Sequence, residues 1–292
     1  MNAERPKTDT YISIRCVIPA DQEEELPELL ESWSVLGTEV HEGSDGGVGV
    51  TVYLSGTDLS DAEAVRQKLI EIGAQNADQK SFEADDWLEG YREQSQPFTV
   101  GSWWWIDPHP DQPTAAPSGR RRLAIEPRMA FGSGSHESTQ AILMALEDIE
   151  VNGRRVLDVG TGSGILALAA ESMGASSVVG LDIDEAAVRV ARETAQQQEW
   201  PSRVNFVLGP VDCIGGEEFD IVMCNMITSS FLPLVGEFRS RLAPAGLVVF
   251  SGLLASEVEL VSGALMEAGF AIPSYRVLGD WASLIAVVAT VP

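Results

Sequence analysis

Apolar and polar residues follow two different patterns along this chain, and the change comes near residue 123. Before it, the apolar residues recur at every second position in some stretches and at helical spacing in others. The predicted order is strand, helix, two strands joined by a Gly-rich turn, helix and strand, over residues 11–18, 21–33, 38–42, 48–54, 61–72 and 77–82. This βαββαβ order is typical of the small α+β ferredoxin-like fold, in which two helices cover one face of an antiparallel sheet.

After residue 123, strands and helices alternate regularly, which is the pattern of an open and mostly parallel α/β sheet. Seven strands are predicted, near residues 155–159, 177–182, 204–208, 219–225, 247–251, 275–278 and 283–289. The helices are predicted over residues 164–173, 185–198, 229–242 and 256–268. The first part has a single histidine, His41, without an obvious partner, so we expect that part to recognise a substrate and the second part to carry the chemistry.

The two patterns are connected by a segment rich in tryptophan and proline. Trp87, Tyr91 and 103–105 supply large apolar surfaces, which we expect to pack between the two halves. Residues 109–119 are rich in proline and are predicted to form a loop. The predicted organisation is a ferredoxin-like substrate-recognition domain over 1–83, a linker over 84–120 and a catalytic domain over 121–292.

The composition adds expectations about location. No apolar run approaches the 18 residues of a membrane span, and the first residues lack the apolar segment of a signal peptide. Cys16, Cys213 and Cys224 lie far apart, without the spacing of metal ligands. These features predict a cytoplasmic protein with reduced thiols, no metal site and no membrane contact.

The charge of the chain is strongly negative. Its 44 acidic and 19 basic residues give a formal net charge of −25. Such a surface repels phosphate backbones, so we expect no direct binding of nucleic acid. It would attract a basic protein substrate and raise the rate of encounter. An acidic surface also serves solubility alone, and the charge does not decide between these two explanations.

The clearest chemical signal is the stretch Asp158–Gly164 (DVGTGSG), between a predicted strand and a predicted helix. Glycines there permit a tight turn and a close approach of the backbone to a ligand. The dinucleotide fingerprint G-x-G-x-x-G/A is nearly met from Gly162, with Ala167 at its last position, so the spacing alone leaves NAD possible. A phosphate-binding P-loop is excluded because no Gly-Lys-Ser/Thr follows.

Two acidic residues narrow the choice of ligand. Asp158 stands two residues before the first glycine, where a carboxylate would repel a pyrophosphate and suits a ligand with a cationic amine and sulfonium. Asp182 ends the next predicted strand, where it can accept hydrogen bonds from both hydroxyls of a ribose. NAD sites also have an acid at the position of Asp182, so Asp158 is the residue that argues against NAD.

These residues resemble the class I S-adenosylmethionine-dependent methyltransferases, and further segments narrow the resemblance. Residues 130–139 (AFGSGSHEST) are similar to the segment A-F-G-T-G-x-H-x-T-T of the ribosomal protein L11 methyltransferases, the PrmA type. Other segments similar to that family are residues 86–91, 103–108, 222–227, 250–256 and 279–281. The resemblance covers roughly residues 84–289, and the N-terminal part agrees with the family in architecture only.

The resemblance implies a Rossmann-like seven-stranded sheet, S-adenosylmethionine as cofactor, and methylation of lysine or α-amino groups of a large-subunit ribosomal protein. It implies that Thr139, Gly160, Asp182 and Asn225 contact the cofactor, with Asn225 also near the transferring methyl group. Further residues expected to shape the cofactor pocket are Phe131, Asp158, Gly162 and Gly164. Alternative readings are a class I methyltransferase of another protein or small molecule, and a cofactor-binding homologue without activity.

His136 is a candidate general base, because histidine titrates near neutral pH. An equally good explanation is that it braces its own loop through hydrogen bonds. A serine hydrolase is excluded for this stretch, because residues 132–135 do not supply the G-x-S-x-G turn between a strand and a helix. We expect catalysis by positioning of the amine, without a dedicated strong base.

Overall fold

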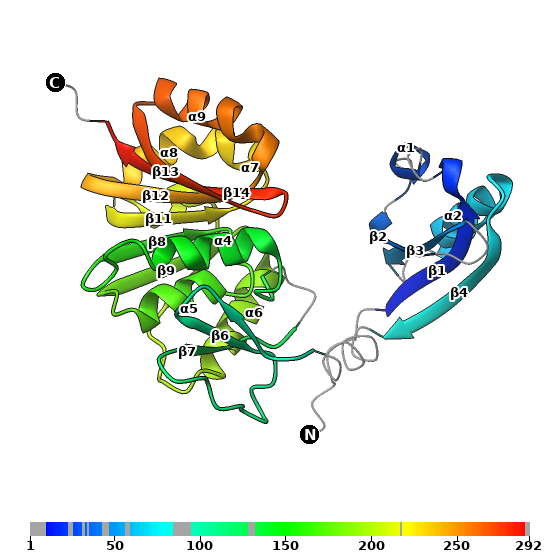
Figure 1. The fold of residues 1–292 in the computed structure, drawn as a ribbon, viewed down its shortest axis with the longest axis horizontal. Coiled ribbons are helices and arrows are strands. Elements are labelled where there is room, and N and C mark those ends of the chain that lie inside the picture. The colour runs from blue at the N-terminus through cyan, green and yellow to red at the C-terminus, as the bar shows by residue number, and fades with distance from the viewer. Residues whose placement is uncertain are drawn as a thin grey trace. The chain divides into compact units, whose positions relative to one another are not determined.

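The computed structural model describes residues 10–22, 26–30, 33, 35–42, 47–55, 59–83, 95–127, 132–216 and 218–289. The chain divides into two compact units, Met1–Glu93 and Gln94–Pro292 (Figure 1). Phe131, for which a role at the cofactor was expected, lies outside the described residues, as do Trp87 and Tyr91.

The N-terminal unit has the element order expected from the sequence. Its elements are β1 (Thr10–Pro19), the 3-10 turn η1 (Ala20–Gln22), α1 (Leu26–Leu30), β2 (Val35–Glu42), β3 (Gly47–Ser55), α2 (Leu59–Glu71) and β4 (Gln75–Glu83). The strands lie in the order β2-β3-β1-β4, and every neighbouring pair is antiparallel. The sequence pattern was expected to give one helix over 21–33, whereas the described residues there form the turn η1 and the short helix α1.

A separate core holds this unit together. Every second residue of β1 and β3 is buried, as the period-2 pattern requires for a sheet covered on one face. Helix α2 contributes its apolar stripe, at the spacing of successive helical turns. The buried residues from these three elements are Ile12, Ile14, Cys16, Ile18, Val50, Val52, Leu54, Ala62, Val65 and Leu69.

The C-terminal unit is built on a seven-stranded sheet in the order β10-β9-β8-β11-β12-β14-β13. The strands are β8 (Arg155–Val159), β9 (Ser177–Asp182), β10 (Asn205–Leu208), β11 (Phe219–Asn225), β12 (Leu242–Leu254), β13 (Phe270–Leu278) and β14 (Trp281–Val288). The first five strands of that order are parallel, and β14 is antiparallel to both of its neighbours. The predicted strands near residues 155–289 are therefore all present.

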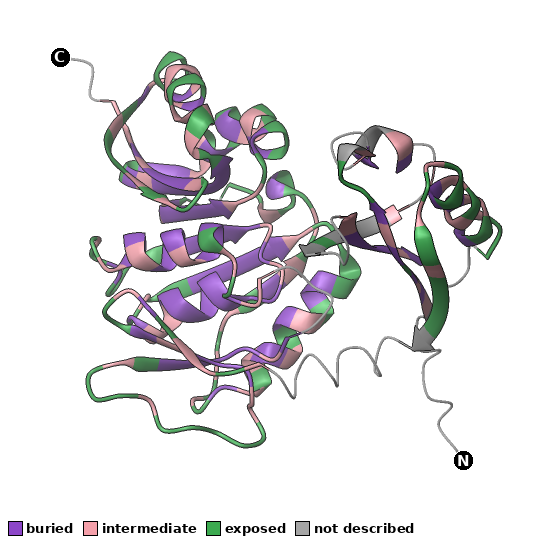
Figure 2. Ribbon diagram, turned by 45° about the vertical axis from the view of Figure 1, so that its right-hand side comes forward, coloured by how far each residue is buried: buried purple, intermediate pink, exposed green. Residues whose placement is uncertain are grey.

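Helices cover both faces of this sheet (Figures 1 and 2). Its helices are α4 (Glu137–Leu146), α5 (Ile165–Ser172), α6 (Glu185–Gln196), α7 (Thr228–Phe231), α8 (Val235–Arg241) and α9 (Val258–Glu267), with 3-10 turns η2 (Val211–Ile214), η3 (Leu232–Leu234) and η4 (Ala255–Glu257). Successive strand residues bury on opposite faces: Val156 packs with α4, α5 and α6, whereas Leu157 packs with α7, α8 and α9. The central strands are thus buried on both sides, as in other parallel sheets.

The strand order indicates at which end of the sheet a ligand binds. After β8 the chain continues to β9 on one side, and β11 follows on the other side of β8. The carboxyl ends of neighbouring parallel strands diverge at such a switch point, and ligands of open α/β sheets bind in the crevice there. The segments that follow β8, β9 and β11 should therefore meet in one site.

The expected linker over 84–120 needs correction. Strands β5 (Phe98–Val100), β6 (Trp104–Asp107) and β7 (Arg121–Ala124) form a three-stranded sheet within the C-terminal unit. Trp104 is fully buried in the core of that unit, and its Nε1 donates to the carbonyl oxygen of Leu143 at 2.8 Å. This tryptophan packs within one unit, and not between two as expected, because it is part of a strand whose inward face meets helix α4.

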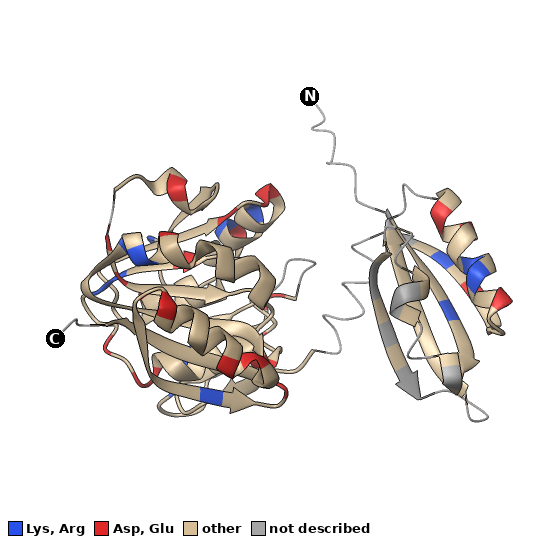
Figure 3. Ribbon diagram, turned by 90° about the horizontal axis from the view of Figure 1, so that it is seen from above, with Lys and Arg blue, Asp and Glu red and all other residues tan. Residues whose placement is uncertain are grey.

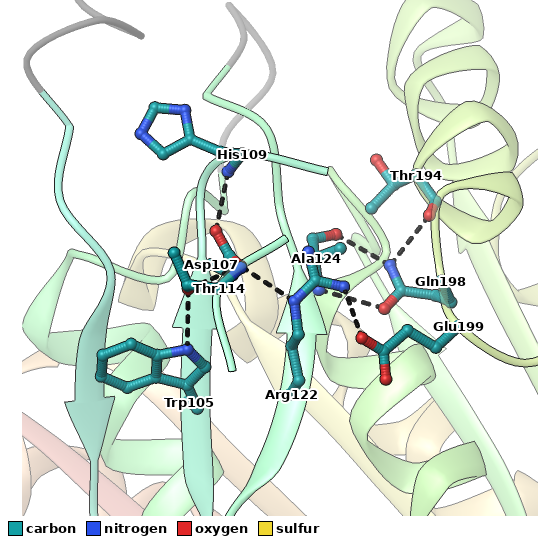
Figure 4. A network of polar contacts seen from close by, with 9 residues as sticks. All are labelled: Trp105, Asp107, His109, Thr114, Arg122, Ala124, Thr194, Gln198 and Glu199. Atoms are coloured by element: carbon teal, nitrogen blue, oxygen red, sulfur yellow. Dashed lines mark hydrogen bonds and ion pairs between the residues drawn. The ribbon is translucent and has the colours of Figure 1, made fainter. Parts of the chain in front are cut away.

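A buried ion pair fixes this small sheet and the Pro-rich loop that connects β6 to β7 (Figure 4). The Asp107 carboxylate is inaccessible to solvent and accepts from Arg122 Nε at 2.8 Å. It also accepts from the backbone N–H groups of His109 and Thr114 and from the Thr114 hydroxyl. Burial by itself raises the pKa of Asp107, but these hydrogen bonds to the charged form outweigh it and lower the pKa.

None of the helices in the described part of the chain is long and apolar enough to cross a membrane. Within the same described residues, no group of three or more His, Cys, Asp or Glu side chains is placed to hold a metal ion.

Candidate active site

A cavity of about 440 Å³ lies at the switch point, where strands β8, β9 and β11 end. Its lining combines the glycine turn after β8, the end of β9, the end of β11, the start of α4 and the start of β14. Among the residues predicted for the site, Gly160, Gly162, Asp182 and Asn225 line this cavity. The structure thus brings together residues from three separate strands, as the strand order requires.

The glycine turn has a backbone that other residues would strain. Gly160, Gly162 and Gly164 have φ angles of 71°, 54° and 85°, in the left-handed region that favours glycine. A Cβ at Gly160 would lie 3.0 Å from Met226 Sδ, and a Cβ at Gly164 would lie 3.0 Å from the ring of Phe206. Gly160 therefore keeps the cavity wall thin, and Gly164 allows α5 to pack closely on the sheet.

Asp158 lies beneath this turn and is fully buried. Its Oδ2 accepts from Thr161 Oγ1 at 2.7 Å and from the Ala167 N–H at 3.2 Å. Its Oδ1 is buried and has no hydrogen-bond partner among the described residues. Burial raises the pKa of Asp158 to about 7, and the nearby Asp182 charge adds to this rise, against the two hydrogen bonds.

Asp182 is half-buried and is fixed to the glycine turn. Its Oδ2 accepts from the Gly162 N–H at 3.0 Å, and its Oδ1 accepts from the Asp184 N–H at 3.1 Å. A carboxylate oxygen has two lone-pair directions, so each oxygen keeps one for a ligand in the cavity. This orientation suits the two neighbouring hydroxyls of a ribose.

Residues 137–140 form the first turn of helix α4, although the sequence pattern indicated a loop there. His136 is the N-cap of this helix: its Nδ1 accepts from the Ser138 N–H at 3.3 Å and lies 2.7 Å from Ser138 Oγ. Its ring meets Trp281 edge-on, with centroids 4.6 Å apart. A nitrogen that accepts from an N–H carries no proton, so the proton of the neutral ring is on Nε2. This geometry favours the bracing role over general-base catalysis.

Thr139 connects helix α4 to the end of β11. It is fully buried and does not line the cavity, and its Oγ1 accepts from Asn225 Nδ2 at 3.1 Å. The Asn225 amide is thereby oriented, and its Oδ1 is buried without a hydrogen-bond partner among the described residues. Thr139 is placed to act through Asn225, and a direct bond from its hydroxyl to a cofactor stays a prediction.

Gly132, which belongs to the segment 130–139, lies against the glycine turn. Ser163 Oγ donates to the Gly132 carbonyl oxygen at 2.6 Å, and a Cβ at Gly132 would lie only 2.8 Å from that hydroxyl. Ser163 had no predicted role, although a serine between two glycines of a ligand turn is a recognisable signal.

Two further contributors to the cavity come from the C-terminal strands. Gly252 bulges out of β12 with φ of 83°, and a Cβ there would collide with the backbone of Met226. Trp281 begins β14 and forms part of the wall. Their distance in sequence from the glycine turn explains why patterning alone assigned them no chemistry.

The family of the chain follows from comparison with known proteins. The model of the family "Ribosomal protein L11 methyltransferase (PrmA)" matches residues 11–288. This chain belongs to that family. The resemblance inferred from the glycine turn and the segment 130–139 is therefore confirmed, and with it the enzyme class, a methyltransferase.

Individual members of the PrmA family agree with this assignment. The chain is 37% identical over 209 residues to a ribosomal protein L11 methyltransferase of Syntrophotalea carbinolica, covering 69% of this chain and 66% of that protein. It is 32% identical over 278 residues to the one of Shouchella clausii, covering 90% and 88%. A crystal structure of the ribosomal protein L11 methylase of Lactobacillus delbrueckii subsp. bulgaricus has 27% identity and a TM-score of 0.62, covering 67% of this chain and all of that one.

A pH test follows from the buried Asp158. Its pKa near 7 lies above the usual value of about 3.9 for aspartate, so the folded protein holds a proton there that the unfolded chain loses. The contribution of Asp158 to the free energy of unfolding is fully present below about pH 4, and it is lost as the pH rises through 7. A cationic ligand favours the carboxylate, so its affinity should rise roughly tenfold between pH 6 and pH 7.5.

Calorimetric titration with S-adenosylmethionine across this range measures the effect. Asp158→Asn should bind more weakly at pH 7.5 and show little dependence on pH, because the amide has no charge to gain. An equal pH dependence in both proteins would contradict the assignment to Asp158.

Proposed function

We propose that this protein transfers the methyl group of S-adenosylmethionine to amines of the large-subunit ribosomal protein L11. The observation that carries the proposal is the cavity in which Asp182 and Asn225, from two strands flanking the glycine turn, face a common space. The relatives named above are ribosomal protein L11 methyltransferases, which supports the same acceptor here. Such a substrate would also place the reaction in the cytoplasm.

The side chains fit the cofactor in three respects. Gly160 has no side chain, and the space that a Cβ would occupy there is left for the methionine portion of the cofactor beside the turn. The Asp182 carboxylate keeps lone pairs for the ribose hydroxyls. The Asp158 carboxyl lies beneath the turn, and its ionised form, which gains population as the pH rises through about 7, favours a ligand with an ammonium and a sulfonium. Gly162 and Gly164 shape the same turn through their positive φ angles. Phe131 lies outside the described residues and stays a predicted pocket residue.

Bound S-adenosylmethionine would supply an electrophilic methyl group: the amine lone pair would attack the methyl carbon in line, the S–CH3 bond would break, and S-adenosylhomocysteine would leave. Asn225 holds the amine. Its Nδ2 is engaged by Thr139, so its Oδ1 is the atom left to accept an N–H of the substrate. A lysine amine must first lose a proton, since its usual pKa is about 10.4. Burial in this site lowers the pKa of an amine and assists that loss.

The surroundings of the cavity suit a cationic acceptor. Asp184 lines the cavity, and the Glu137 side chain lies beside the turn at Gly279, next to Trp281. Acidic residues lie on elements of both units (Figure 3), and the formal charge of the chain is −25. We infer that a basic protein is drawn to this surface and that apolar walls such as Trp281 and Ile227 exclude water from the amine.

A labelled-methyl transfer assay tests the proposal. Large-subunit ribosomal proteins from a strain lacking this activity are incubated with the protein and labelled S-adenosylmethionine, and the labelled product is identified by mass spectrometry. Label on L11 amines is the expected result. Cofactor binding without label on any ribosomal protein would favour a methyltransferase of another substrate, and absence of cofactor binding would favour a non-catalytic homologue.

A further inference from the structure

A second cavity, of about 780 Å³, lies at the end of the large sheet opposite to the end that forms the candidate active site. Its walls come from the start of β7, the end of α5 and the connection between α6 and β10. Helix α5 starts at the carboxyl end of β8 and runs back along the sheet, so its last turn marks the opposite edge. None of the residues that line this cavity lines the active-site cavity.

Arginines gather in this second cavity. Arg120, Arg121, Arg122 and Arg203 line it, although residues 94–292 contain only twelve arginines and no lysine. One third of the arginines of the C-terminal unit therefore line this one cavity. Like charges repel one another, and such a cluster is costly unless anions compensate for it.

Arg120 and Arg121 are held in place by hydrogen bonds to backbone carbonyl groups. Arg120 Nη1 donates to the carbonyl oxygens of Gly101 and Trp104, at 2.9 and 3.0 Å. Arg121 donates to the Ser172 carbonyl oxygen, and its guanidinium lies 5.6 Å from the centre of the Trp103 ring. Side chains fixed in this way lose little further freedom when a ligand binds.

Arg122 is the most deeply set of the four, with 6% of its side chain exposed. Figure 4 shows it between two carboxylates: Nε donates to Asp107, and Nη1 donates to Glu199 at 3.1 Å. Its Nη2 has no hydrogen-bond partner among the described residues. Gln198 fixes the neighbouring end of α6 by two hydrogen bonds to the backbone of Ala124.

The acidic residues of the cavity are already engaged. Glu171 accepts from Trp200 Nε1 at 3.0 Å with one oxygen and from the Arg203 N–H with the other. Glu199 is paired with Arg122. The Arg203 guanidinium, in contrast, forms no hydrogen bond or ion pair with any described residue, and it is exposed at the rim. Positive charge therefore remains available to a ligand.

We propose that this cavity binds a small phosphate-bearing molecule of about the size of a nucleotide. Guanidinium groups bind phosphate through paired N–H donors. The Ser202 hydroxyl on the same wall accepts from the Val204 N–H and can still donate its own proton. The indole of Trp200 offers an apolar face beside them. A volume of this order is typical of small-molecule sites. A nucleic acid backbone carries the same phosphate chemistry, but the net charge of −25 repels a long polyanion.

Calorimetry on the full-length protein tests this proposal with three probes: inorganic pyrophosphate, uridine monophosphate and a single-stranded RNA twelve nucleotides long. We expect pyrophosphate or uridine monophosphate to bind, and the dissociation constant to rise at least tenfold in Arg203→Ala and in Arg121→Ala. Arg189→Ala, which removes an exposed arginine of α6 outside the cavity, should leave it unchanged.

Two outcomes would overturn the proposal. If the twelve-nucleotide RNA binds more tightly than uridine monophosphate with the same dependence on Arg203, the cavity serves a nucleic acid backbone. If neither small probe binds, or if both bind Arg203→Ala and wild type equally, the arginine cluster is structural. Because all three variants lie away from the active-site cavity, their methyl-transfer activity reports separately on the proposed function.

Discussion

Replacement of Asn225 with alanine is expected to lower the turnover number for methyl transfer by about a hundredfold to a thousandfold. The loss follows from the geometry, because Thr139 engages Nδ2 and leaves Oδ1 as the one atom of this amide that can hold the incoming amine. The glycine turn and Asp182 remain intact, so the dissociation constant for S-adenosylmethionine should change by less than about threefold.

Steady-state kinetics together with calorimetry separate these two quantities. Asn205→Ala provides the matched control, since Asn205 is exposed at the start of β10, on the opposite edge of the sheet. Unchanged turnover in Asn225→Ala would remove Asn225 from the catalytic role. A loss of affinity as large as the loss of turnover would instead make it a cofactor-binding residue alone.

Replacement of Asp107 with alanine is expected to lower the free energy of unfolding of the C-terminal unit by about 3–5 kcal/mol. The change leaves the buried Arg122 without its carboxylate partner at Nε, and it removes the acceptor for two backbone N–H groups of the Pro-rich loop. Thermal unfolding followed by circular dichroism measures the effect, with a fall in the midpoint of about 10 °C.

The pH dependence of this effect has a definite sign. Since the pKa of Asp107 is lowered in the folded protein, its contribution is present above the usual value of about 3.9 and is lost as the pH falls through the lower folded value. The difference between wild type and Asp107→Ala should therefore shrink in acid. Asp111→Ala, an exposed change in the same loop, should have no measurable effect, and an equal effect of both substitutions would contradict the role of the ion pair.

The local pattern of apolar and polar residues was sufficient to predict the strands of the large sheet. The predicted strands over 155–159, 177–182 and 219–225 coincide with β8, β9 and β11, because each is a short apolar run bounded by turns. Asp158, Gly160 and Asp182 could be singled out as well, since a glycine turn after a parallel strand has few structural uses. The position of these residues at one end of the sheet then follows from strand order.

Features that depend on distant contacts could not be predicted in the same way. Strand β6 pairs with β7 across the Pro-rich loop, and its stability depends on the Asp107–Arg122 pair, which is 15 residues apart in sequence. Helix α4 begins among glycines and serines, and only the His136 cap and its packing on β12 and β14 make it helical there. The contact between Thr139 and Asn225 spans 86 residues and has no local signal.

Intact-mass spectrometry of purified ribosomal protein L11, incubated with S-adenosylmethionine and this protein, shows whether L11 is the methyl acceptor. We expect mass increases in steps of one methyl group, located on lysine or α-amino groups by fragmentation, and at least a hundredfold slower increases with Asn225→Ala under the same conditions. An L11 mass that stays unchanged with folded, cofactor-binding wild-type protein would contradict the assignment of L11 as the substrate.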